Sequence, residues 1–240
     1  MARPFLTARW QHLLFFNFRC PADLLQRYVP SGTELDPFEG AHYVSLVGFL
    51  FRDTLVRGIP IPCHRNFEEV NLRFYVRREL PGETRRAVVF LKELVPRRAI
   101  AAVARRFYQE PYEAVEMSNA TDLESARRGL IAYYWGYAGR PYGMRASVEG
   151  VPQLADAGGH ADYITEHYWG YTAQHDGGTI EYKVEHPRWR LWSPVDAGLD
   201  GDFSRIYGPE FGAILQRQPE SVLAAEGSEV KVFPGTRIPA

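Results

Sequence analysis

Lysine is scarce in this chain of 240 residues, which contains only Lys92, Lys183 and Lys231. Few side chains are therefore available for amine chemistry, such as formation of a Schiff base with a carbonyl compound. The 28 basic residues, nearly all arginine, are balanced by 29 acidic residues. Because no strongly basic balance exists, neither nucleic acid nor an anionic membrane is expected as a partner.

Cysteine and long apolar runs are equally rare. The two cysteines, Cys20 and Cys63, match neither a zinc-binding spacing nor a CxxC motif, so we expect two free thiols in a reducing cytosol. No apolar run approaches the roughly 18–20 residues that span a bilayer. Residues 1–10 lack the charged and apolar segments of a signal peptide. The sequence therefore predicts a cytoplasmic protein.

Motifs for nucleophilic catalysis, phosphate binding and metal binding are missing as well. The chain has no GxSxG motif, no P-loop and no GxGxxG pattern. Its seven histidines form neither an HxH nor an HExxH motif. The sequence thus indicates no cofactor and no metal site.

Short strand signals, in contrast, recur along the whole chain. The cleanest alternation of apolar and polar residues runs over 69–76, and a Pro-Gly turn leads to a partner strand over 86–95. Further strands are expected over 41–51, 112–117, 129–137, 142–149 and 229–233. Helices are expected over 21–28 and 99–107, while 203–211 fits either a last helix or a docked loop. Since no linker or repeat divides the chain, we expect one mainly β domain over residues 1–240, with two or three short helices.

The polar face of the 69–76 strand is the first candidate site. Glu69, Asn71 and Arg73 alternate with apolar residues and therefore share one face of the strand. A carboxylate, an amide and a guanidinium within one strand's reach can hold a small carboxylate or carbonyl group, with Arg73 binding two oxygens. The alternative is a solvated outer face with a weak Glu–Arg pair.

A ring-rich hairpin is the second candidate. The His175-Asp176-Gly177-Gly178 turn predicts a strand pair over 163–171 and 180–186, which would place His167 on one strand and His186 on the other. Either histidine could act as acid or base, oriented by Glu166 or Glu185. The alternative is an interior histidine that is hydrogen-bonded to the backbone.

Lys92 is a third candidate because it lies in an apolar strand, where burial could lower its pKa and make it a nucleophile. The alternative is a strand-edge lysine that pairs with Glu93 or Glu68.

Six short motifs follow one another along nearly the whole chain. They are 38–47 (FEGAHYVSLV), 66–76 (NFEEVNLRFYV), 88–91 (VVFL), 104–112 (ARRFYQEPY), 165–168 (TEHY) with Tyr171, and 186–189 (HPRW). In order and spacing these motifs together resemble the YqjF-like family of bacterial proteins of unknown function. The chain departs from the family at His167, where the family tends to have Arg, and at Arg188, where it tends to have a second Pro.

That family is in turn remotely similar to acetoacetate decarboxylase. The resemblance implies a mainly antiparallel, cone-shaped β-barrel with an internal cavity. In the decarboxylase, a Phe-Pro-Lys-Lys motif presents the lysine that forms the Schiff base. Here the matching stretch is Glu110-Pro111-Tyr112-Glu113, which contains no lysine. The resemblance therefore implies the cavity but not decarboxylation through an imine.

The residues expected to line this cavity are Glu69, Asn71, Arg73, Tyr112 and Glu113, with Glu69, Tyr112 and Glu113 as candidates for catalytic roles. We hypothesise that the cavity binds a small organic molecule, an oxo-acid or another carbonyl compound. Arg73 would hold its anionic end, and Glu69 or Tyr112 would move a proton. The alternative is a non-enzymatic sensor or a scaffold for protein interaction. The sequence does not decide between a monomer and a homo-oligomer.

Overall fold

The computed structural model describes residues 3–62, 64–96, 111–125 and 128–238, and strands dominate this part of the chain. The helices are α1 (Ala22–Gln26), α3 (His160–Thr165) and α4 (Ser204–Leu215). The strands of the larger sheet are β1 (Leu6–Arg19), β2 (Glu34–Leu35), β3 (Tyr43–Val56), β4 (Ile59–Pro60), β5 (Phe67–Leu80), β6 (Glu83–Val95), β7 (Tyr112–Ala114), β12 (Gln153–Leu154), β13 (Trp169–Ala173), β14 (Thr179–Glu185), β15 (Arg190–Trp192), β17 (Ser221–Val232) and β18 (Thr236–Ile238). The smaller sheet contains β8 (Met117–Asn119), β9 (Asp122–Ser125), β10 (Arg128–Tyr137), β11 (Arg140–Glu149) and β16 (Asp196–Asp200).

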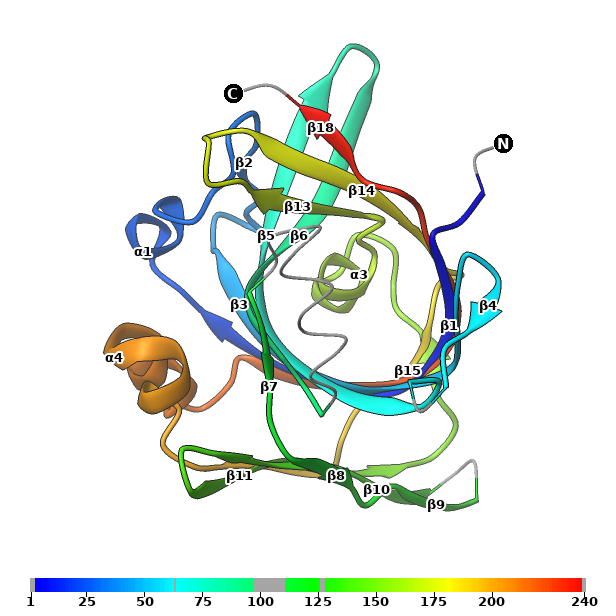
Figure 1. Ribbon diagram of the computed structural model, residues 1–240. Coiled ribbons are helices and arrows are strands. Elements are labelled where there is room, and N and C mark those ends of the chain that lie inside the picture. Colours follow the sequence, from blue (N-terminus) through cyan, green and yellow to red (C-terminus); the bar gives the residue numbers. More distant parts are fainter. Residues whose placement is uncertain (1–2, 63, 97–110, 126–127, 239–240) are drawn as a thin grey trace.

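Seven strands of the larger sheet follow one another until the last pairs with the first, in the order β17-β1-β3-β5-β6-β13-β14. The pairing of β14 with β17, through Val184 and Val232, completes this ring (Figure 1). Neighbouring strands are antiparallel except where β6 meets β13. The expected mainly β fold is confirmed, and most, though not all, of the pairing is antiparallel as predicted.

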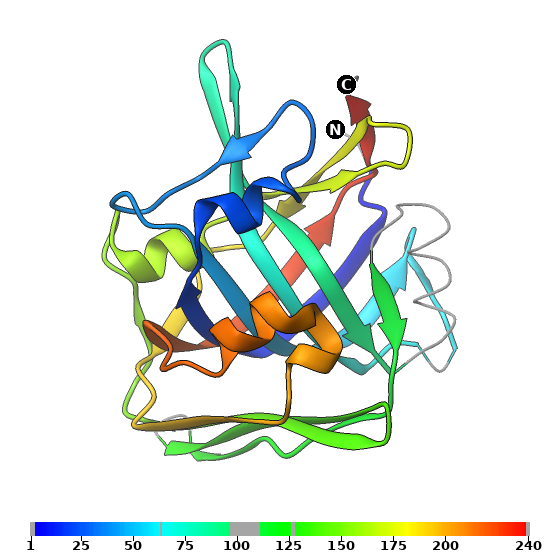
Figure 2. The same ribbon diagram turned by 90° about the vertical axis from the view of Figure 1, so that its left-hand side faces the viewer.

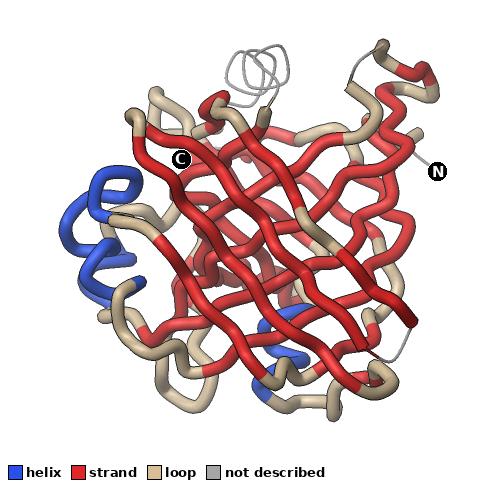
Figure 3. The backbone as a smooth tube through the Cα atoms, turned by 90° about the horizontal axis from the view of Figure 1, so that it is seen from below, coloured by secondary structure: helices blue, strands red, loops and turns tan. Residues whose placement is uncertain are grey.

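The smaller sheet lies beneath the ring, and its strands run across those of the ring when seen from below (Figures 1 and 3). A hydrophobic layer separates the two sheets. From β5, Val70, Leu72 and Phe74 pack into this layer, together with Tyr133 of β10 and Met144 of β11. Because alternate residues of a strand face opposite sides, the polar residues that alternate with these apolar residues in β5 face the inside of the ring.

The inside of the ring is filled mainly by aromatic side chains. Phe15, Phe49, Phe67 and Trp189 belong to one buried cluster that is distinct from the layer between the sheets. The helix α3 lies within the outline of the ring in Figure 1 and at one of its ends in Figure 2. Tyr163 of this helix joins the same cluster, so α3 packs against the aromatic interior at this end of the ring.

Most expected elements are present. Residues 163–165, which were expected in a strand, belong instead to α3, and the Asp162 carboxylate accepts a hydrogen bond from the Gly158 amide at the start of this helix. Of the two alternatives for 203–211, the helix is confirmed, because residues 204–211 belong to α4, which is interrupted at Gly208 (φ 82°). The expected strand 229–233 is the end of the longer β17, and β18 follows it. The helix expected over 99–107 falls outside the described residues.

None of the helices in the described ranges has the length and apolar character that a membrane crossing requires.

Candidate functional site

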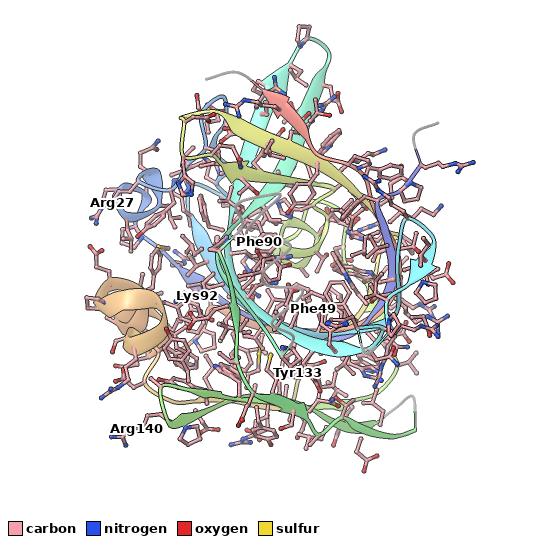
Figure 4. All side chains as sticks on the ribbon, viewed as in Figure 1. Arg27, Phe49, Phe90, Lys92, Tyr133 and Arg140 are labelled. Carbon is pink, nitrogen blue, oxygen red and sulfur yellow. The ribbon has the colours of Figure 1, made fainter. Side chains whose placement is uncertain are left out.

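A pocket of about 290 Å³ lies inside the ring. Strands β1, β3, β5, β6, β13 and β14 contribute to its wall, as does the segment between α3 and β13. Most of the wall is apolar. Figure 4 shows the phenyl groups of Phe49 and Phe90 inside the ring of strands. Tyr133 lies instead between the ring and the smaller sheet.

The polar row of β5 lines this pocket. Glu69, Asn71 and Arg73 are 3%, 2% and 8% exposed, so each is withdrawn from bulk water. Asn71 Nδ2 donates to Glu69 Oε1 at 3.0 Å, and Tyr112 Oη, also on the pocket, donates to Glu69 Oε2 at 3.3 Å. The structure thus brings together four of the five residues that the sequence nominated.

Arg73 is the buried cation of this row. Its Nη2 donates to the backbone carbonyl of Ile164 at 3.1 Å, and its guanidinium lies over the rings of Phe15 and Tyr75, at 5.3 and 5.7 Å from their centroids. Its Nε has no hydrogen-bond partner among the described residues. Arg73 also forms no ion pair with any carboxylate in the described ranges, although burial of an unpaired charge is costly.

Glu113 does not reach the pocket, which corrects the expectation from sequence. In β7, Tyr112 pairs with Glu93 and Glu113 pairs with Leu94. Successive residues of a strand point to opposite sides, so the inward position of Tyr112 sends Glu113 outward. There Glu113 accepts hydrogen bonds from Lys92 Nζ at 3.2 Å and Tyr137 Oη at 3.4 Å.

A β-bulge in β6 decides the position of Lys92. Leu72 pairs with Lys92 but Arg73 pairs with Phe90, so Leu91 is an extra residue in the ladder. As a result Phe90 and Glu93, three residues apart, both line the pocket, while Lys92 points away from it. In Figure 4 Lys92 lies on the outer side of the ring, and its partner is neither Glu93 nor Glu68 but Glu113.

Glu93 is a pocket residue that the sequence analysis missed as a site candidate. It is 1% exposed and lies next to Tyr112 through the β6–β7 pairing. Simple alternation from Arg73 across the hairpin gives the wrong face for residues beyond the bulge. No sequence pattern marks the bulge, so the signal for Glu93 was only its charge within an apolar strand.

His167 and His186, the candidate histidines, both line the pocket, and neither is hydrogen-bonded to a glutamate among the described residues. His167 packs on Tyr75, with ring centroids 4.7 Å apart. His186 stacks on Trp189 at 4.1 Å, and its Nδ1 lies 2.9 Å from the carbonyl oxygen of Pro187. Glu166 instead accepts a hydrogen bond from Tyr168.

Burial lowers the pKa of both histidines, so both are neutral at pH 7. For His167 the pKa falls well below its usual value, chiefly through loss of solvent and further through the nearby charges of Arg86 and Arg73. For His186 loss of solvent is also the main cause. Among the described residues that line the pocket, Arg73 therefore supplies the positive charge at this end.

Metal binding finds no support in the described part of the chain, where no group of three or more His, Cys, Asp or Glu side chains is arranged to hold an ion.

Comparison with known proteins assigns a family. Residues 7–229 match the family model of DUF2071, described as "Uncharacterized conserved protein", and the chain belongs to that family. One relative is the uncharacterized protein YqjF of Bacillus subtilis (strain 168), which is 29% identical over 189 residues that cover 76% of this chain and 73% of YqjF. The resemblance read from the sequence motifs is confirmed.

Solved structures confirm an acetoacetate-decarboxylase-like fold. An acetoacetate decarboxylase-like enzyme from Sphingomonas wittichii RW1 has a TM-score of 0.69 at 12% identity, over 98% of this chain and 93% of that one. Acetoacetate decarboxylase from Legionella pneumophila has a TM-score of 0.66 at 13% identity, over 99% and 88%. The enduracididine biosynthesis enzyme MppR complexed with pyruvate also scores 0.66, at 14% identity over 99% and 91%. At such identities the likeness shows the fold alone.

Proposed function

We propose that the ring of strands serves as a cone-shaped barrel whose pocket binds a small organic anion, an oxo-acid or another carbonyl compound. Arg73 holds the anionic end of this ligand. Glu69 and Tyr112 are placed to exchange a proton with it, because the Tyr112 hydroxyl already contacts the Glu69 carboxylate.

The observation that carries this proposal is the buried guanidinium of Arg73. A cation that is 8% exposed, lies over two aromatic rings and forms no ion pair in the described ranges is expensive to keep. An anionic ligand offsets that cost by forming charge-assisted hydrogen bonds, which are stronger than neutral ones. Pyruvate bound to MppR, a protein of similar fold, supports an oxo-acid as the ligand class.

Lysine chemistry is not part of the proposal. All three lysines lie in the described residues, and none lines the pocket. Lys92 is bound to Glu113, and Lys183 donates to Glu185 at 2.8 Å. No amine is therefore positioned to form a Schiff base with a ligand in this cavity.

The test measures binding of a panel of small carboxylates and their methyl esters by calorimetry, on the wild type and on Arg73→Met. We expect carboxylates to bind and the variant to lose at least about tenfold in affinity, since a charge-assisted contact is lost. Arg140→Met is the matched control, because Arg140 is an exposed arginine of β11 far from the ring (Figure 4). Equal binding by all three proteins would remove Arg73 from the site.

Stability of the unliganded protein separates binding from a structural role. Removal of a buried charge that has no ion pair in the described ranges and loss of the hydrogen bond to Ile164 act in opposite directions, so Arg73→Met is expected to change the free energy of unfolding by less than about 2 kcal/mol. A large loss of stability in Arg73→Met would instead point to Arg73 as a structural tie to Ile164.

A non-enzymatic sensor is the second candidate, and the largely apolar wall favours it. The two are separated by exchange of the α-protons of a bound oxo-acid with deuterated water, followed by NMR. Exchange that is lost in Glu69→Gln and reduced in Tyr112→Phe indicates catalysis. Binding without exchange indicates a sensor.

A further inference from the structure

A buried imidazole that has no hydrogen-bond partner among the described residues lies at the Arg73 end of the pocket. His167 is 7% exposed and lines the pocket, with Tyr75 on one side and the edge of Tyr163 at 5.8 Å and 85° on another. Neither of its ring nitrogens forms a hydrogen bond with a described residue, although the nearby Ile164 carbonyl slightly favours the protonated ring. Buried polar atoms nearly always have a partner, so an unpartnered imidazole in the wall of a cavity points to a ligand.

His167 and Arg73 serve the same end of this cavity. Both side chains lie against the ring of Tyr75, with the Arg73 guanidinium 5.7 Å and the His167 ring 4.7 Å from its centroid. Arg73 also binds the carbonyl of Ile164, three residues before His167. A neutral imidazole offers one donor and one acceptor, and Arg73 Nε offers a further donor. The pair can therefore hold two neighbouring oxygen-bearing groups.

Aromatic side chains line much of the rest of the pocket. Trp10, Phe49, Phe51, Phe67, Phe90 and Trp189 line it. Its volume is about 290 Å³. A three-carbon acid such as pyruvate would leave much of this apolar space unfilled, which favours a larger apolar body.

We propose that the ligand is a 2-oxo or 2-hydroxy carboxylic acid with an apolar tail of about the size of a phenyl group, and that His167 recognises its 2-oxygen. The carboxylate binds Arg73, and the tail lies among the rings. This inference rests on the proposed function, and it goes further by naming the ligand class and a specificity-determining residue.

Three probe ligands test the contributions of the carboxylate, the apolar tail and the 2-oxygen separately. Phenylpyruvate carries all three groups, pyruvate lacks the tail, and 3-phenylpropionate lacks the 2-oxygen. We expect phenylpyruvate to bind about tenfold to a hundredfold more tightly than pyruvate, since a phenyl ring is buried. We expect it to bind about tenfold more tightly than 3-phenylpropionate, since the orphaned imidazole gains a partner.

The protein variant for this test is His167→Phe, which keeps a flat ring against Tyr75 and removes both nitrogens. Calorimetry at pH 7.5 on the full chain is expected to show phenylpyruvate and 3-phenylpropionate binding within about twofold of each other. A merely structural role of His167 would weaken both ligands equally and keep their ratio, which would overturn the inference. If the variant does not fold, the wild-type ratio decides, and equal binding of these two ligands overturns the role of His167.

The outcomes also separate this inference from the function beneath it. Pyruvate binding as tightly as phenylpyruvate, with loss in Arg73→Met, would overturn the apolar tail while the proposed function stands. Binding of no carboxylate at all would overturn both.

Discussion

The pairing of β17 with β1 in the ring requires a residue without a Cβ atom at position 227, and the substitution Gly227→Ala tests this requirement. Gly227 lies in β17 opposite Gln11 of β1, at a φ of +85°. A Cβ atom added there would lie 1.9 Å from the carbonyl oxygen of Trp10. Next to Gln11, His12 also has a positive φ (54°), and the β1–β3 register shifts between Gln11 and Leu14. Both strands therefore bend where Trp10 and Leu13 turn into the pocket.

The expected loss for Gly227→Ala has two parts. The left-handed conformation costs a residue with a Cβ atom about 1–2 kcal/mol. The clash leaves the new atom about 1.5 Å short of an ordinary contact, and the neighbour is backbone that cannot turn away. Separation of the strands there breaks two or three hydrogen bonds at about 1 kcal/mol each. We expect a total loss of about 3–5 kcal/mol in the free energy of unfolding, a large share of the stability of an ordinary domain.

Gly82→Ala is the matched control. Gly82 lies in the Pro81-Gly82 turn between β5 and β6 and has nearly the same φ, +80°, but a Cβ atom there would meet nothing within 4 Å. This variant should lose only the conformational part, about 1–2 kcal/mol. Urea denaturation followed by tryptophan fluorescence measures both. Losses within about 1 kcal/mol of each other would refute the reasoning, whereas failure of Gly227→Ala alone to fold would agree with it.

Three further predictions concern titratable side chains: Lys92, His167 and Glu181. Lys92→Gln should leave carboxylate binding unchanged within about twofold. Borohydride should trap no adduct of an oxo-acid with the wild type. An adduct that depends on Lys92 would contradict the outward position of this side chain. Burial holds the pKa of His167 well below the 6.5 of the unfolded chain. As pH falls below 6.5 the unfolded state takes up the proton first, so stability present above that pH is lost below it. His167→Phe should therefore show a smaller loss of unfolding free energy between pH 7.5 and 5.5, and an equal loss would count against a buried neutral ring. Glu181, 6% exposed, accepts hydrogen bonds from Arg78 at 3.0 Å and Arg85 at 2.6 Å. Glu181→Gln should cost about 3 kcal/mol in urea denaturation, because Arg78 loses its carboxylate partner and Arg85 keeps only Glu83. A loss under about 1 kcal/mol would show that solvent compensates the two cations.

Alternation within a single strand was enough to predict the polar row of the site. Glu69, Asn71 and Arg73 differ in type from the residues between them, and a side chain's face in a strand depends only on its position. The same rule applied to β7 separates Tyr112 from Glu113, so the expectation that both line the pocket conflicted with strand geometry. The resemblance to the decarboxylase motif implied two neighbouring pocket residues, whereas the backbone of β7 allows only one.

Relations between strands were harder to predict. The bulge at Leu91 changes which residues of β6 face the pocket, admitting Glu93 and excluding Lys92. A bulge is a small difference in pairing energy between two strands, and no residue in this hairpin marks it. The smaller sheet that covers the ring was also not anticipated, because its strands carry the same signals as those of the ring.

The position of His167 depends on contacts from three separate parts of the chain, which is why its strand assignment failed. Tyr163 Oη donates to the Asp36 carbonyl at 2.7 Å, and Arg86 Nε donates to the Asp36 carboxylate at 2.7 Å while its guanidinium lies 4.9 Å from the Tyr163 ring centroid. These contacts hold α3 at its end of the ring and thereby set His167 beside Tyr75.

Arg73 has two tasks in this arrangement, and they constrain each other. One nitrogen, Nη2, ties β5 to α3 through the Ile164 carbonyl, while Nε has no partner in the described residues. A guanidinium is planar and rigid, so the tie to Ile164 also fixes the direction of the unused donor. Preorganisation of this kind lowers the entropy cost of binding, since the ligand meets a donor that is already in place. A lysine at this position would supply the charge without the fixed direction. Arg73→Lys is therefore expected to bind carboxylates more weakly than the wild type, and equal affinity would show that charge alone is sufficient.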